Sequence, residues 1–287
     1  MAVKFFGQFL VEKGAVSREI LLQAIDLQES VNLSFGATAL TMGLLTEADI
    51  EKVHDAQRNE DLRFGDMAVK MGILTAEQMQ QVLSRQKDTH LYIGEALVRV
   101  GGLKAEELPI HLEAFKVDQA PYATSTITIP PGIVEGQCWE MVVDLSHKML
   151  TRVALLNFRP EPCSRAETLQ AMDIYAAMAF SGDISGRYFV GVSAATQAKI
   201  AREILKEASV SHEPQDVLDD TVMEFVNVVC GNIAAKGAQF GKSIDIAPPE
   251  IVDGSQGIPV PPGHAGLLFP VVLAEGGTVV MAAFIKQ

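Results

Sequence analysis

The sequence has few cysteines and no long hydrophobic run. Its three cysteines, Cys138, Cys163 and Cys230, are an odd number without the spacing of a metal-binding motif. They favour a reduced protein, so we expect a cytoplasmic location. No run of about 18 apolar residues is present, and the first residues hold no hydrophobic stretch long enough for a signal peptide, so we expect no membrane insertion.

Basic residues are also scarce. The chain has 23 Lys and Arg against 36 Asp and Glu, a net charge of −13 and an isoelectric point near 4.9. Residues 1–118 contain 12 basic and 18 acidic residues, and residues 119–287 contain 11 and 18. Because both halves are acidic, we expect no nucleic-acid polymer as a partner. An acidic surface can still attract a basic protein, or hold a small ligand in a local pocket.

Common catalytic signatures are missing as well. The six histidines, at positions 54, 90, 111, 147, 212 and 264, show no metal-ligand pairing, so we predict no metal site. Residues 237–243 are one residue short of a phosphate-binding P-loop, and they are predicted to follow a helix rather than a strand. No Gly-x-Ser-x-Gly motif occurs.

A tandem repeat fills the first part of the chain, which at 287 residues and 48% apolar content has room for one or two globular domains. Gly7, Gly36, Gly65 and Gly94 are 29 residues apart, and each follows Phe or Ile. Three further series keep this register: Gly14, Gly43, Gly72 and Gly101; Leu21, Ile50, Met79 and Leu108; and Gln28, Gln57 and Gln86, with Phe115 in the fourth unit. Four copies in phase predict tandem structural units.

Each unit is predicted to be a helix pair. A short helix ends at the second glycine, and Ser17, Thr46 or Thr75 then caps a longer helix that runs about twelve residues to the glutamine. A pair this short cannot bury its apolar face alone, so neighbouring units must pack together. We therefore expect a helical repeat domain over 1–117.

These units resemble the N-terminal module of type II secretion and pilus ATPases. The resemblance rests on the glycine spacing, the glutamine that ends the long helix in three of the four units, and the third unit's Arg63-Phe-Gly65. Some members of that family bind cyclic di-GMP, which implies a ligand site at Arg63, Gly65, Gly72 and Gln86. The other units carry Phe5, Ser34 and Tyr92 in place of the arginine. Since the phosphates would lack paired arginines, a protein-binding version of the module is favoured.

A composition shift marks a linker over 118–126, and a second domain is expected over 127–287. Helices are predicted over 133–149, 193–208 and 214–237, and strands over 152–158, 173–180, 186–192, 243–251, 267–273 and 278–285. This pattern predicts an α+β fold with a mostly antiparallel sheet and helices on one face.

The third of these helices carries a polar motif. Asp220, Glu224 and Asn227 are spaced i, i+4 and i+7, so they project within about 60° of one another. Two interpretations are open: a solvated helix face, or a small acid–amide site. Gly231 lies farther along the same helix at a cost of about 1 kcal/mol relative to Ala, which indicates a packing or functional reason.

The order of elements, the motif, the following Gly231-Asn232 and the segment from Pro249 to Gly254 resemble the CheC/CheX/FliY chemotaxis phosphatases, above all the CheX branch. The resemblance implies a phosphatase for the aspartyl phosphate of a receiver-domain response regulator. Asn227 would orient the attacking water and Glu224 would reach the receiver's lysine, with Asp220, Gly231 and Asn232 in support.

The same resemblance bears on cofactors and partners. This chain would need no cofactor, because the magnesium resides on the receiver. The first predicted helix carries Glu140 and Asp144 instead of a second Glu-x-x-Asn, so we expect one site. A homodimer through sheet edges is implied too, with an edge strand expected in the final hairpin. The alternative function is a non-catalytic signalling adaptor whose repeats bind cyclic di-GMP or a protein.

Overall fold

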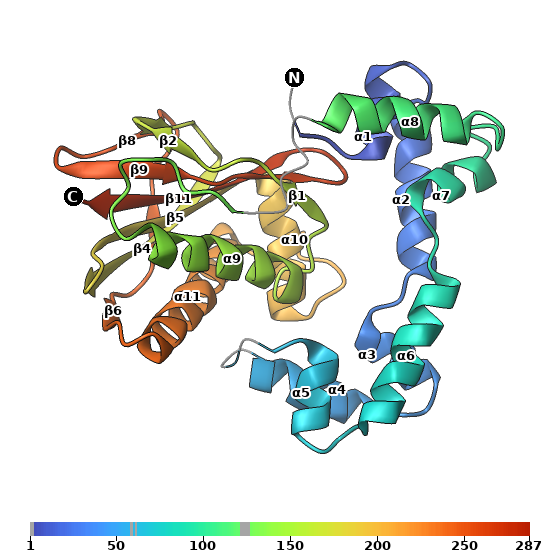
Figure 1. Ribbon diagram of the computed structural model, residues 1–287, viewed down its shortest axis with the longest axis horizontal. Coiled ribbons are helices and arrows are strands. Elements are labelled where there is room, and N and C mark those ends of the chain that lie inside the picture. The colour runs from blue at the N-terminus through green and yellow to red at the C-terminus, as the bar shows by residue number, and fades with distance from the viewer. Residues whose placement is uncertain (1–2, 58–59, 61, 121–126) are drawn as a thin grey trace. The chain divides into compact units, whose positions relative to one another are not determined.

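Figure 1 shows the computed structural model, which describes residues 3–57, 60, 62–120 and 127–287. The chain divides into two units: a helical unit, Phe5–Asp118, and a C-terminal unit of Gln119–Gln287 together with Met1–Lys4. The linker expected at 118–126 begins inside a helix, because Asp118 and Gln119 are helical, and residues 121–126 lie outside the described residues. No helix in the described chain is both long and apolar enough to cross a membrane.

The helical unit confirms the predicted repeat, since four short helices alternate with four longer ones. They are α1 (Phe6–Glu12), α2 (Arg18–Val31), α3 (Phe35–Thr41), α4 (Glu47–Gln57), α5 (Phe64–Lys70), α6 (Ala76–Thr89), α7 (Ile93–Arg99) and α8 (Leu108–Gln119). Every short helix has seven residues. The glycines that follow them, Gly14, Gly43, Gly72 and Gly101, all have φ between 69° and 76°, a conformation that side chains with a Cβ rarely adopt.

The first glycine series allows each short helix to approach its longer partner closely. A Cβ on Gly94 would lie 2.6 Å from Cδ1 of Leu108, and one on Gly65 would lie 3.1 Å from Cγ of Met79. A Cβ on Gly7 would lie 2.3 Å from Cδ1 of Leu21, whereas one on Gly36 would lie 3.3 Å from Cζ of Phe64 and 3.5 Å from Cδ1 of Ile50, an ordinary contact distance. The in-phase glycines and in-phase apolar residues of the sequence are therefore the two sides of one helix–helix contact.

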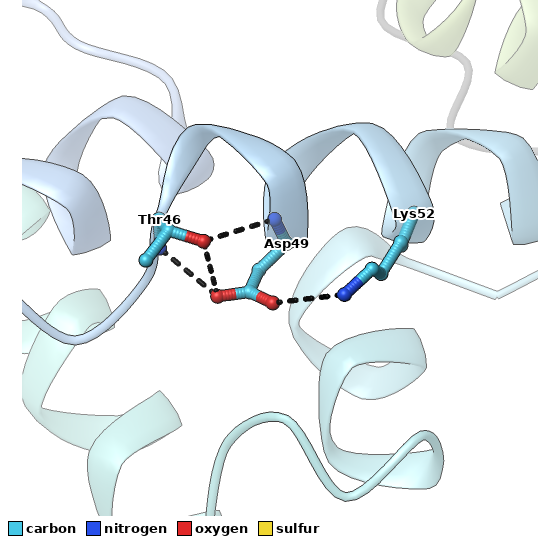
Figure 2. Close-up of polar contacts among 3 residues, drawn as sticks. All are labelled: Thr46, Asp49 and Lys52. Atoms are coloured by element: carbon cyan, nitrogen blue, oxygen red, sulfur yellow. Dashed lines mark hydrogen bonds and ion pairs between the residues drawn. The ribbon is translucent and has the colours of Figure 1, made fainter.

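Polar caps start the longer helices as predicted. The hydroxyls of Ser17, Thr46 and Thr75 accept hydrogen bonds from backbone N–H groups three residues on. Figure 2 shows the cap of α4, where Asp49 accepts hydrogen bonds from the backbone N–H and hydroxyl of Thr46 and its other oxygen lies 3.7 Å from Nζ of Lys52. These hydrogen bonds lower the pKa of Asp49, which stabilises the charged form at the helix N-terminus.

The units pack in two pairs, each with its own core. The first and fourth units share one core, and the second and third share the other. The repeat glutamines join the members of each pair: Gln28 donates to the carbonyl of Leu91, Gln57 to that of Leu62, and Gln86 to that of Leu33. Each acceptor precedes the Phe-Gly or Ile-Gly pair of the partner unit by two residues. The glutamine series of the sequence is therefore explained by one repeated hydrogen bond between units.

The fourth unit departs from this pattern. Phe115 stands in place of the glutamine and packs edge-to-face on Phe6 and Phe9, with ring centroids 5.4 and 5.5 Å apart. Its long helix also begins later than the repeat predicts, because α8 starts at Leu108.

The C-terminal unit contains three helices and eleven strands among its described residues. They are α9 (Gly136–Arg152), β1 (Phe158–Pro160), β2 (Ser164–Ala166), β3 (Thr168–Leu169), β4 (Ile174–Gly182), β5 (Gly186–Val192), α10 (Ala194–Leu205), α11 (Gln215–Gln239), β6 (Ile244–Ile246), β7 (Glu250–Val252), β8 (Ile258–Pro259), β9 (His264–Leu268), β10 (Val271–Leu273) and β11 (Thr278–Lys286). The predicted helices and the central hairpin β4–β5 are confirmed.

Every described strand pairing is antiparallel, as the α+β prediction requires. β11 lies inside the sheet, between β5 on one side and β9 and β10 on the other. The expectation that the final hairpin exposes an edge strand is therefore wrong, because β9 and β10 are covered in turn by β2 and β1.

Three strand predictions are also wrong. Of the strand predicted over 152–158 only Phe158 is a strand residue, the first of β1, because α9 continues to Arg152 and Leu155 then adopts a left-handed conformation with φ of 46°. The strand predicted over 243–251 is split into β6 and β7, which pair with different parts of β4. The strand predicted over 267–273 is likewise split into β9 and β10, which pair with different parts of β11. The short strands β1, β2, β3 and β8 were not predicted, since two or three residues show no periodicity.

The sheet has two different faces. In Figure 1, α9 and α11 lie side by side over one face, where Val190, Met281 and Ala283 join the main core. The alternate residues of the same strands, such as Phe189, Val280 and Phe284, form a smaller cluster on the other face. Strand alternation thus separates a helix-covered face from a face covered by loops and short strands.

Lys4 and Gln119, which flank the helical unit in the sequence, belong to the C-terminal unit. The guanidinium of Arg159 in β1 donates to the carbonyl of Lys4 and to Oε1 of Gln119. The same Oε1 accepts from the backbone N–H of Lys4 at 3.0 Å. In the repeat register Lys4 corresponds to Leu33, Leu62 and Leu91, and its carbonyl accepts from Arg159 where theirs accept from a glutamine.

We predict unequal effects of removing two repeat glutamines. Gln57 is buried, so Gln57→Ala leaves the carbonyl of Leu62 without a partner and should destabilise the helical unit by about 1–2 kcal/mol. Gln86→Ala should cost less, because its bond to Leu33 is exposed and water can replace it. Thermal unfolding followed by far-ultraviolet circular dichroism measures both, and equal losses would contradict the assignment.

We predict an acid-sensitive site at His147. Its ring packs on Phe158, Nε2 is buried without a hydrogen-bond partner, and burial lowers the pKa to about 4 despite the opposing effect of Asp144. Since the folded-state pKa lies below the unfolded value of about 6.5, this contribution to stability is complete above pH 6.5 and is lost as the pH falls towards 4.

Between pH 7 and pH 5, the wild type should therefore lose about 1–2 kcal/mol more stability than His147→Phe, which cannot be protonated. Urea unfolding followed by the fluorescence of Trp139, the one tryptophan of the chain, reports on this unit. Parallel pH profiles for the two proteins would show that His147 is not the group responsible.

Candidate functional site

α11 is held on the sheet by a fully buried face. Val222, Phe225, Val226 and Val229 have 0% exposure and lie in the main core. This orientation leaves Asp220, Glu224 and Asn227 exposed on the opposite side of the helix. The predicted polar stripe is therefore present, on a helix whose rotation is fixed by packing.

Glu224 and Asn227 contact each other. Nδ2 of Asn227 donates a hydrogen bond of 3.2 Å to Oε2 of Glu224. This bond orients the amide, so Oδ1 and the second N–H of Asn227 remain available to a water or a partner. The second carboxylate oxygen of Glu224 can accept from a cation. The pair thus presents an oriented neutral amide beside a carboxylate, both open to solvent.

Asp220 is exposed one turn before the pair, and among the described residues no hydrogen bond joins it to Glu224 or Asn227. Its neighbour Asp219 has the anchoring role that sequence reasoning missed. Oδ1 of Asp219 accepts from Gln197 and Gln215, each at 2.8 Å, and so ties the start of α11 to α10. Gln197 is a buried polar residue of α10, and no sequence motif marks it as a partner of α11.

The two residues that follow the pair have opposite environments. A Cβ on Gly231 would meet nothing within 4 Å, so no internal packing explains this glycine. Asn232 is buried and donates to the carbonyl of Val228 at 2.9 Å. Gly231 therefore belongs to the surface beside the pair, whereas Asn232 is part of the helix interior.

The corresponding positions of α9 are different. Glu140 is exposed, and Asp144 pairs with Lys148 at 2.8 Å within the helix. Neither residue contacts an amide in the manner of Glu224.

One group of possible metal ligands occurs in the described part of the chain. Nε2 of His212 lies 3.4 Å from Glu207 and 2.9 Å from Glu213, in the loop between α10 and α11. All three residues are at least partly exposed, and contacts of the His212 ring with two neighbouring carboxylates account for the arrangement. The spacing of these residues in the sequence does not predict the group, because the contact follows from the turn of the loop.

The ligand residues predicted in the helical unit have structural surroundings. Gly65 packs against Met79, Gly72 ends α5 with φ of 70°, and Gln86 bonds to Leu33. Arg63 is exposed at the start of α5, beside the carbonyl that Gln57 binds. Arg63 thus follows directly the residue that the glutamine of the second unit binds, and cyclic di-GMP binding stays a prediction.

Comparison with known proteins gives a family match for part of the chain. Residues 174–271 match the family described as chemotaxis phosphatase CheX. This stretch contains α10 and the whole of α11, and therefore both Glu224 and Asn227. The C-terminal unit is thus similar to CheX over its central region. No curated protein shows significant similarity to the chain.

Several solved structures are similar to the chain over about half its length. A CheX chemotaxis protein from Desulfovibrio desulfuricans is 17% identical with a TM-score of 0.45, covering 52% of this chain and 99% of that protein. A CheX–CheY complex with BeF3 and magnesium from Borrelia burgdorferi is 18% identical with a TM-score of 0.43, covering 52% and 97%. FliY from Thermotoga maritima is 14% identical with a TM-score of 0.39, covering 54% and 92%.

We predict opposite effects of Ala at two glycines of α11. Gly231→Ala should stabilise the C-terminal unit by about 0.5–1 kcal/mol, because Ala favours the helix and its methyl group meets open space. Gly237→Ala should destabilise it, because a Cβ there would lie 2.7 Å from Cδ1 of Ile244. Urea unfolding followed by Trp139 fluorescence tests both, and a loss of stability in Gly231→Ala would reveal an unrecognised packing role.

Proposed function

We propose that the C-terminal unit dephosphorylates the aspartyl phosphate of a receiver-domain response regulator in chemotaxis or a related two-component pathway. The observation that carries the proposal is the exposed, hydrogen-bonded pair of Glu224 and Asn227 within the stretch that matches the CheX family. An amide and a carboxylate on a solvent-facing helix have no role in the core of this unit. A partner that brings its own reactive group would meet them directly.

Asn227 has the chemistry needed to position water. An acyl phosphate is already activated, so a catalyst accelerates its hydrolysis chiefly by holding a water in line with the phosphorus. The amide can accept a hydrogen bond from that water through Oδ1, and it carries no charge that would repel the phosphoryl oxygens. Its bond to Glu224 reduces the number of side-chain orientations, which favours one water position.

Glu224 has a separate role in the proposal. Its carboxylate can pair with the receiver's active-site lysine and so fix the partner's position on α11. The magnesium belongs to the receiver, and the chain itself needs only the two side chains. Asp220 adds a negative charge one turn away and supports the same cationic contact.

Docking depends on local shape in this proposal, because the chain has a net charge of −13 and cannot attract an acidic partner at long range. Phe225 is fully buried and is a core residue rather than a docking residue. Gly231 and the exposed Ala235 continue the stripe beyond Asn227 with minimal side chains. They leave room for a partner's backbone or side chains next to the pair.

Binding of cyclic di-GMP and formation of a homodimer are also proposals, and each needs its own measurement. A non-catalytic adaptor is the alternative function, with cyclic di-GMP or a protein bound to the helical unit. Calorimetry with cyclic di-GMP, using Arg63→Ala as the comparison, addresses the first ligand. Light scattering at micromolar concentration addresses the homodimer.

The function is tested with a magnesium-loaded receiver phosphorylated by acetyl phosphate. Asn227→Ala should slow dephosphorylation about a hundredfold, because it removes the group that orients water. Glu224→Gln keeps an acceptor for Asn227 but loses the charge, so it should weaken receiver binding more than it lowers the rate at saturation. Asn157→Ala, at an exposed asparagine outside α11, is the control and should match the wild type.

If the wild type and Asn227→Ala act alike on a panel of receivers, Asn227 has no catalytic role. An inactive wild type that still binds phosphorylated receivers would favour the adaptor.

A further inference from the structure

Three basic side chains and one aromatic ring share the sheet face that α11 does not cover. Arg187 in β5 lies opposite Phe284 in β11, and His264 in β9 lies opposite Lys286 in β11. Paired residues project to the same face, as do residues two apart in one strand, so all four side chains lie on one face. Phe284 also packs in the cluster on that face with Phe189.

A pocket of about 420 Å³ is formed there, and its size is within the usual range for small-molecule sites of about 300–1,000 Å³. Ile258 and Pro259 line it from β8, Pro261 lines it from the loop between β8 and β9, and Phe284 lines it from β11. The pocket therefore has rigid apolar walls, because proline and phenylalanine side chains lose little entropy when a ligand binds.

The polar side of the pocket is positively charged. Nη2 of Arg187 pairs with Oε1 of Glu250 at 2.8 Å, and the guanidinium lies 5.2 Å from the centroid of the Phe189 ring. Its Nε is buried without a hydrogen-bond partner, and one carboxylate cannot satisfy five N–H donors. Among the described residues no carboxylate pairs with Lys286.

The local charge is opposite to that of the surrounding unit. Residues 119–287 contain 11 basic and 18 acidic residues, yet two of the basic ones line this pocket with His264. Glu250, 60% exposed at its side chain, is the one acidic group paired with the pocket's arginine. Apart from that ion pair, the remaining N–H groups of Arg187 and the ammonium group of Lys286 are available to a ligand in the pocket.

We propose that this pocket binds a small anionic ligand, one that carries a phosphate or carboxylate group on a flat apolar body. The anionic oxygens would meet Arg187 and Lys286, since a guanidinium fork and an ammonium both bind such groups. The apolar body would lie against Phe284 and the two prolines. The pocket lies across the sheet from α11, so this site is independent of Glu224 and Asn227.

Phenyl phosphate is a suitable probe, because it combines both features. In a titration of the full-length, isotope-labelled chain, it should shift the backbone amide signals of Gly186, Arg187 and Lys286. Inorganic phosphate should bind more weakly because it cannot use the apolar wall, and benzyl alcohol more weakly because it has no charge. Benzoate carries a carboxylate on the same ring. Tighter binding of phenyl phosphate than of benzoate would indicate a phosphate site, and the reverse order a carboxylate site.

Charge variants provide the sharper test. Lys286→Gln should weaken phenyl phosphate binding about five- to tenfold, whereas Lys148→Gln, the same change on α9, should not. Glu250→Gln should strengthen binding severalfold, because it removes the carboxylate that competes for Arg187. Its control is Glu140→Gln on α9, which changes the net charge equally.

Three outcomes would overturn the proposal. The first is a set of shifted signals that lies away from β5 and β11. The second is equal binding by benzyl alcohol and phenyl phosphate, which would mean a purely apolar pocket. The third is an equal effect of Lys286→Gln and Lys148→Gln in variants whose spectra show an intact fold, which would mean a response to net charge alone.

Discussion

The packing of α11 on the sheet is the contact on which the C-terminal unit depends. Phe225 and Val226 are fully buried, and each further residue rotates the side-chain direction by about 100°. With this face fixed, Glu224 and Asn227 must point to solvent. A different rotation of the helix would bury a carboxylate without a partner, which is strongly unfavourable. The same hydrophobic contact therefore stabilises the unit and presents the proposed catalytic pair.

In the helical unit, close approach at glycine has the corresponding role. Gly94 against Leu108, and its equivalents in the other units, allow a seven-residue helix to lie against a longer one. Helices this short are unstable alone, so the units must pair, and the repeat glutamines join each pair. Much of the repeated sequence motif is thus explained by packing and helix termination. Arg63, exposed at the start of α5, is outside this explanation.

The two faces of the sheet have different surroundings, and the side chains of β11 alternate between them. Met281 and Ala283 face the helices, while Ala282 and Phe284 face the loops and short strands. One face supports α11 and its acid–amide pair, and the other supplies the floor of a basic pocket. A ligand in that pocket would contact β5 and β11, the strands with which α11 and its neighbours form the core, without obstructing the exposed stripe.

The sequence by itself determined the features that depend on neighbours three to seven residues apart. The caps at Ser17 and Thr75, the ends of β5 and the exposed stripe of α11 follow from local periodicity and turn chemistry. The repeat register follows instead from the 29-residue spacing of its glycines. Only the tertiary structure decided the rest: the central place of β11, the split of β6 from β7, and the presence of Arg187 and Lys286 in one pocket. These features depend on strand pairing between distant segments, whose register is set by burial across the whole sheet and leaves no local signal.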